Sequence, residues 1–350
     1  MKRLDFLDYW RGWAIVLMVF NHTARWWLES ATLGALQERV VYFTVTLAAP
    51  FFLFLVGFSL ALSFFRAREA KRLPSAKIVV KYLKRGLFII ILGYVFNFLI
   101  LTSQNSILRG QVLQAIGSTI ILAIPFLFLS QKKFFQFVFL ALALAIVFFG
   151  PIAFSLSVSA PLLEKINWFF TAFPLIPWFG FALLGLVLGR IFLELRDNQK
   201  KLAWFFGVLG FLGVIGLAIA FVGKELFLDG YFFAFGHDFV VNAWWAPKGL
   251  TVFWVLGMIF IFLVGCYFLD QFGKWRITWL KNLGQTALMI YFAHHLIGLD
   301  LLSYVFNFKL ATPVGYFCAS LVFLVILVFS SGCWLELINY LKKKFDYRRS

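Results

Sequence analysis

Apolar residues fall along the chain in runs of about 20, separated by shorter polar segments. A helix of that length crosses a hydrocarbon layer roughly 30 Å thick, so each run predicts a membrane-spanning helix. The predicted spans lie near residues 9–28, 41–65, 84–102, 110–129, 134–152, 174–193, 202–222, 249–269, 279–298 and 312–338. The pattern predicts an all-α, polytopic transmembrane bundle of about ten helices, with residues 1–350 as a single integral membrane domain.

The composition supports a membrane protein. With 63% hydrophobic and 13% charged residues, the chain has more apolar surface than one soluble core can hide. A net charge of +17 would suggest nucleic acid in a soluble protein, but the basic residues crowd into a few loops, so no nucleic-acid partner is predicted. The three cysteines lie within apolar runs and form no CxxC pattern, so no metal is predicted either.

Basic residues give the orientation, because they bias their loops to the cytoplasm. The segment 66–85 holds eight of them and is placed inside. Alternation of the spans then puts 25 of the 32 basic residues inside and 7 outside, which predicts that both termini are cytoplasmic. The compact size and the lack of a signal sequence favour a bacterial inner membrane over an organelle membrane.

The first predicted span contains Asp8, Arg11 and His22, and ionisable groups inside a span are functional candidates by default. Arg11 and His22 return to within about 20° of the same helix face, about 16 Å apart along the axis. Ile15 and Met18 lie between them. Such a face suits a long flexible ligand with its anionic end at Arg11, braced by Asp8, and its reactive end at His22. The alternative is a snorkelling arginine and a structural histidine.

Further polar candidates lie elsewhere in the chain. His294 and His295 are consecutive in the ninth span and project about 100° apart, so at most one is predicted to face the bundle centre with His22. The candidate ligand-binding side chains are Asn21, Gln111, Gln114 and Asp238. For the two glutamines, hydrogen bonding between helices is an equal alternative.

Five stretches occur in one order over most of the chain: LDYWRGWAIVLMVFNH at 7–22, APFFLFLVGFSLALS at 49–63, VLQAIG at 112–117, FPLIPWFGFALLG at 173–185 and LGQTALMIYFAHH at 283–295. Together they resemble the integral membrane acyltransferases related to heparan-alpha-glucosaminide N-acetyltransferase and, more distantly, the acyltransferase-3 family. The spacing of an arginine, ten residues and a histidine is the most specific of these features.

The resemblance implies that acyl-CoA, with acetyl favoured, binds from the cytoplasmic side and that the acyl group passes to a sugar hydroxyl or amine on the far side. It matches Arg11 to the family arginine near the cytoplasmic face, His22 to the acyltransferase-3 histidine and His294 to the histidine that ends the late helix motif. In the animal lysosomal members an asparagine replaces His22, and the catalytic histidine lies in the first lumenal loop. The corresponding loop here, 29–40, contains no histidine, which favours His22.

His22 is therefore expected to act as general base on the acceptor, while an acyl-histidine intermediate and a catalytic His294 stay open. The expected partners are acyl-CoA, a sugar or glycan acceptor and the lipid bilayer, with a homodimer as one allowed assembly. The basic segment 66–85 is assigned to anionic lipid ahead of CoA phosphates. The alternatives are a transporter or flippase of a sugar or lipid-linked substrate, and an interaction protein with structural histidines. Transport is disfavoured because no carboxylate lies near the middle of a span.

Overall fold

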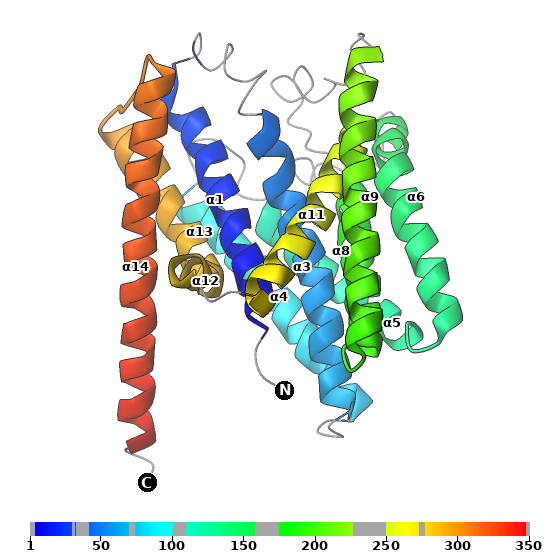
Figure 1. Ribbon diagram of the computed structural model, residues 1–350. Helices are drawn as coiled ribbons and strands as arrows, with labels where there is room; N and C mark the ends of the chain where they lie inside the picture. Colours follow the sequence, from blue (N-terminus) through cyan, green and yellow to red (C-terminus); the bar gives the residue numbers. More distant parts are fainter. Residues whose placement is uncertain are drawn as a thin grey trace. The chain divides into compact units, whose positions relative to one another are not determined.

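The structure, a computed structural model, describes residues 4–29, 32, 42–69, 74–100, 110–157, 175–226, 250–272 and 277–347. Within these ranges the regular elements are all helices, which confirms the predicted all-α class. They are α1 (Asp5–Trp27), α3 (Tyr42–Glu69), α4 (Ser75–Leu99), α5 (Val112–Leu129), α6 (Lys133–Ser157), α8 (Leu175–Leu195), α9 (Gln199–Leu226), α11 (Leu250–Phe272), α12 (Thr278–Gln285), α13 (Ala287–His295), the π-helix η2 (Leu296–Val305) and α14 (Pro313–Tyr347) (Figure 1).

The described helices are those of an integral, multi-pass membrane protein. Eight of them, with α13 and η2 taken as one, are long and apolar enough to cross a bilayer. Two more, α1 and α4, occupy the other predicted spans, and each carries four charged side chains. Large apolar side chains such as Phe134, Phe211 and Phe329 are exposed, as expected of surfaces that face lipid.

The ninth predicted span is not one helix. It divides at Thr286 into α12 and α13, and α13 continues into the π-helix η2, so the prediction of a continuous helix over 279–298 was wrong. Thr286 lies outside regular helical geometry, and its hydroxyl donates to the carbonyl of Asn282 at 2.9 Å. Figure 1 shows α12 end-on beside α1. The break lets α12 and α13 follow different directions.

The chain forms two compact units. The first contains residues 1–49 and 262–350, and the second contains residues 50–261. The first unit is thus assembled from the two ends of the chain, with α1 packed against α12, α13, η2 and α14. That all 350 residues act as a single domain stays a prediction.

Glycines allow close helix packing in the second unit. Gly57 on α3 lies against the carbonyl of Ala182 on α8, and Gly185 on α8 lies against the carbonyl of Phe54 on α3. Each glycine therefore faces the backbone of the other helix, an approach that any side chain would prevent. Gly189, one turn further along α8, repeats the contact at Phe58.

We expect Gly185→Ala to destabilise the protein, because its Cβ would overlap the backbone of α3 and force the helix pair apart. Overpacking of this kind costs about 1–3 kcal/mol or more. The measurement is the midpoint of thermal unfolding in detergent, followed by size-exclusion chromatography. The matched control is Gly207→Ala on α9, where a Cβ meets open space and the better helix propensity of alanine should leave stability unchanged or raised. Equal midpoints for the two variants would contradict the packing described.

Candidate active site

Helix α1 is unbroken from Asp5 to Trp27 and therefore holds Arg11 and His22 in the geometry that the sequence predicts. The two residues share one face and lie about 16 Å apart along the axis. Between them, Ile15 is fully buried and Met18 nearly so. The strip that joins Arg11 to His22 is therefore packed against other parts of the protein in this structure.

The N-terminal end of α1 carries a network of charged and polar side chains. Asp8 is buried and forms an ion pair with Arg11, one turn further along the helix. The other carboxylate oxygen of Asp8 accepts a hydrogen bond from Nε2 of Gln285 on α12, at 3.2 Å. A second ion pair joins Lys281 of α12 to Asp5. The guanidinium of Arg11 is thus held by a buried carboxylate while its side chain keeps 28% of its surface exposed.

Two glycines explain why α12 reaches this network. Gly284 of α12 lies against the backbone of Asp8, and Gly12 of α1 lies against the carbonyl of Leu280. The two helices therefore approach backbone to backbone, which places Gln285 directly beside the Asp8 carboxylate. This contact was not predicted from the sequence.

Three histidines meet at the C-terminal end of α1. Nδ1 of His22 lies 2.9 Å from Nε2 of His294, and the two rings are stacked with centroids 5.2 Å apart. The ring of His295 stands edge-on to His22 at 4.9 Å, and ligand nitrogens of all three histidines lie within 4.8 Å of one another.

The prediction that at most one of His294 and His295 faces His22 was wrong. Side chains 100° apart on α13 diverge, but imidazole rings are long enough to close the gap when the partner lies between them. His22 occupies that intermediate position, because its ring contacts both neighbours. His295 is therefore a site residue that sequence reasoning missed.

The backbone determines which ring nitrogens carry protons when the rings are neutral. Nδ1 of His294 lies 2.8 Å from the carbonyl of Ile290, which only accepts hydrogen bonds, so this nitrogen is the donor. Nε2 of His294 then has the lone pair, and Nδ1 of His22 must donate to it. The remaining nitrogen of His22, Nε2, is left as a basic lone pair.

His295 follows the same rule. Its Nδ1 donates to the carbonyl of Tyr291 at 3.0 Å, which leaves the lone pair on Nε2. His294 and His295 are both buried, whereas His22 is half-buried. Of the three rings, His22 is thus the one most accessible to a reactant.

Aromatic side chains cover the histidines. Trp26, one turn after His22, stacks on His294 and lies edge-on to His295, with ring centroids 5.7 and 5.0 Å apart. Tyr291 contacts His294 and His295 from their own helix. The carbonyl of Trp26 accepts hydrogen bonds from Ser303 and Lys309. Trp26 is a second site residue that sequence reasoning missed, although its place four residues after His22 was a usable signal.

The other predicted residues fall into three groups. Asn21 is buried beside His22 in the chain, and its Oδ1 has no hydrogen-bond partner among the described residues. Gln111 and Gln114 belong to the second unit and cap α5. The backbone N–H of Gln111 donates to Oε1 of Gln114 at 3.0 Å. Asp238 lies outside the described residues.

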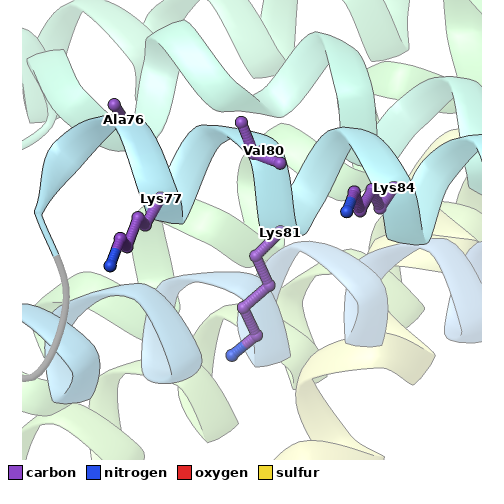
Figure 2. Close-up of a pocket in the computed structure, with 5 residues that line it drawn as sticks. All are labelled: Ala76, Lys77, Val80, Lys81 and Lys84. Carbon is purple, nitrogen blue, oxygen red and sulfur yellow. The ribbon is translucent and has the colours of Figure 1, made fainter.

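A groove of about 500 Å³ runs along α4 in the second unit. Its lining is Ala76, Lys77, Val80, Lys81 and Lys84, all from one side of the helix. In Figure 2 the side chains of Lys77 and Lys81 extend away from α4. The lining combines two apolar side chains with three lysine ammonium groups and has the chemistry to hold phosphate.

Fold and site together define a multi-pass membrane protein with a braced arginine at one end of its first helix and a histidine cluster at the other. Residues 3–222 match the family described as heparan-alpha-glucosaminide N-acetyltransferase, catalytic, and the chain belongs to this family. The match includes α1 but ends before α12 and α13. No curated protein matches the chain.

Membership of the family confirms the resemblance found in the sequence. It gives the chain a membrane acetyltransferase-like function and implies acetyl-CoA as a co-substrate. The roles of individual site residues stay predictions.

Nuclear magnetic resonance of protein labelled with nitrogen-15 histidine tests the proton positions. At a pH where the rings are neutral, we expect His22, His294 and His295 each to carry the proton on Nδ1. His294→Ala should shift the Nδ1–H resonance of His22 strongly, because that bond loses its acceptor. The fourth histidine, His237, is assigned by its loss in His237→Ala. A proton on Nε2 of His22 would contradict the arrangement.

Proposed function

We propose that the protein transfers an acyl group, most simply acetyl, from cytoplasmic acyl-CoA to a hydroxyl or amine of a sugar or glycan on the far side of the membrane. The observation that carries the proposal is the His22–His294 hydrogen bond, which leaves a basic lone pair on His22 in a chain of the acetyltransferase family. Both termini are cytoplasmic in this proposal, and the membrane is a bacterial inner membrane.

In the proposed reaction His22 acts as general base. Its Nε2 takes the proton from the acceptor O–H or N–H as the acceptor atom bonds to the thioester carbonyl carbon. The tetrahedral intermediate collapses by breaking the C–S bond, and the CoA sulfur leaves with the proton returned from His22. The products are the acylated acceptor and the free thiol of CoA.

His294 supports this base without touching the reactants. When Nε2 of His22 takes a proton, the ring becomes cationic, and its Nδ1–H bond to His294 becomes a charge-assisted hydrogen bond. The carbonyl of Ile290 holds the acceptor nitrogen of His294 toward His22. His294 is therefore a positioning residue, and His22 is the catalytic one.

Asn21 is proposed to bind the acceptor. Its buried Oδ1 lacks a hydrogen-bond partner among the described residues, and leaving such an atom unpaired costs about 1–3 kcal/mol. A hydroxyl or amine of the acceptor would satisfy it. The amide nitrogen of the same side chain would be available to the oxyanion of the tetrahedral intermediate.

Arg11 is proposed to hold the anionic part of acyl-CoA, with Asp8 keeping the guanidinium in place. The acyl arm would then follow the α1 face toward His22, which requires the buried side chains of Ile15 and Met18 to move aside. The lysine groove of α4 is assigned to anionic lipid phosphate, in keeping with its place at a predicted cytoplasmic boundary.

His22→Ala should lower kcat for acetyl transfer by about 10² to 10⁴-fold, the usual contribution of a general base. His294→Ala should lower kcat less, because the base remains while its orientation is lost. The assay follows release of CoA from acetyl-CoA by detergent-purified protein with a set of sugar acceptors. His237→Ala is the matched histidine control and should keep the wild-type rate. Full activity in His22→Ala would overturn the assignment.

Arg11→Ala should raise KM for acetyl-CoA by about tenfold or more, since hydrogen bonds to charged groups contribute about 1.5–3 kcal/mol. Because Arg11 lies far from the reacting atoms, kcat should change little. The comparison variant is Lys281→Ala, which breaks the other ion pair at the same end of α1 and should leave KM unaltered. An Arg11→Ala variant with lower kcat and normal KM would place the arginine elsewhere in the reaction.

A further inference from the structure

The three histidines share a feature beyond their closeness. His294 and His295 each donate Nδ1–H to the carbonyl four residues earlier on their own helix, to Ile290 and Tyr291 respectively. These bonds fix the tautomer and leave a lone pair on Nε2 of both rings. Metal-binding histidines are usually held in this way, with one ring nitrogen donating to a backbone carbonyl while the other ligates.

The spacing of the ligand nitrogens also suits a metal ion. Around a tetrahedral Zn²⁺ with bonds of about 2.0–2.1 Å, ligand nitrogens lie about 3.3 Å apart. His22 and His294 are at 2.9 Å, and the three histidines have ligand nitrogens within 4.8 Å of one another. Binding an ion would widen the 2.9 Å separation of His22 and His294 and bring the third nitrogen in from no more than 4.8 Å. Among the described residues, this is the group of histidine, cysteine or carboxylate side chains with such a spacing.

We propose that His22, His294 and His295 bind one divalent transition-metal ion of the zinc class. Imidazole ligands select zinc, copper or nickel over magnesium and calcium, which prefer oxygen. Three protein ligands leave a fourth position for water or another ligand. The lack of a CxxC pattern predicted no metal, but a cysteine pattern carries no information on histidines that meet from helices far apart in the sequence.

Metal binding changes the proton arrangement without net gain or loss of protons. The Nδ1 proton of His22 moves to Nε2 of the same ring, and Nδ1 then bonds to the metal beside the Nε2 atoms of His294 and His295. His22 no longer carries a basic lone pair. An inhibitory effect of the bound ion on acyl transfer follows, and this consequence alone rests on the proposed function.

The binding test uses the full chain, purified in detergent with a tag that contains no histidine and treated with a chelator. Titration with Co²⁺ should give one bound ion per chain with the visible absorption bands of a four-coordinate ion. X-ray absorption of the Zn²⁺-loaded protein should show three imidazole ligands. A six-coordinate spectrum, or no saturable binding, overturns the proposal, and these measurements on the unaltered chain do not depend on any variant folding.

Variants then locate the ion. His295→Gln should weaken Co²⁺ binding at least about tenfold, since even outer-shell changes cost 10–100-fold in metal affinity. His237→Gln is the matched control and should bind as the wild type does. Equal affinity in wild type and His295→Gln, or loss of binding in His237→Gln, would overturn the assignment.

The activity measurement separates the two proposals. One equivalent of Zn²⁺ should suppress acetyl transfer by wild-type protein, and a chelator should restore it. Saturable binding of the ion without suppression of acetyl transfer would overturn the inhibitory effect, while the three-histidine metal site would stand. Full acetyl-transfer activity in metal-free His22→Ala would contradict the catalytic proposal. That result would not affect the metal site, because Co²⁺ binding is measured without turnover.

Discussion

The backbone of α12 lies directly on the backbone of α1, because Gly12 and Gly284 present no side chains where the two helices meet. Both ends of the candidate site depend on this contact. At the N-terminal end of α1 it brings Gln285 to Asp8, which holds Arg11. After the break at Thr286, α13 continues directly from α12 and places His294 and His295 beside His22.

The other end of α1 is anchored by polar groups that find partners inside the protein, as they must where water is scarce. The hydroxyl of Thr23 pairs with Ser320 of α14 at 2.9 Å, and the indole of Trp27 donates to the carbonyl of Gly298 at the same distance. Lys309 donates to the carbonyl of Trp26 near the C-terminus of α1, where a positive charge is favourable. His22 thus lies on a helix that polar contacts hold at both ends.

Much of the fold could be predicted from hydropathy, since every predicted span overlaps a described helix and the apolar pattern is strong over about 20 residues. The break at Thr286 could not, because a hydropathy window averages over many residues and one non-helical residue leaves no trace in it. Of the site, periodicity correctly related Arg11 to His22 because both lie on one helix. Periodicity gives no information on which other helix a face meets, so the convergence of His294 and His295 on His22 required the structure. Trp26 differs, because its place four residues after His22 on the same helix was a usable signal.

The hydrogen bond between His22 and His294 joins residues 272 positions apart in the sequence. His22 lies on α1 and His294 lies on α13, so a ribosome makes α1 well before α13. At synthesis rates of about 5–20 residues per second, α1 waits roughly 15–50 s for its partner. During that interval the charged and imidazole side chains of α1 lack their partners on α12 and α13. Other contacts must stabilise them in the membrane, such as those with the insertion machinery or lipid headgroups. Biogenesis of this protein therefore includes a period in which α1 and its charged and imidazole side chains have been made but α13, which carries the partner of His22, has not.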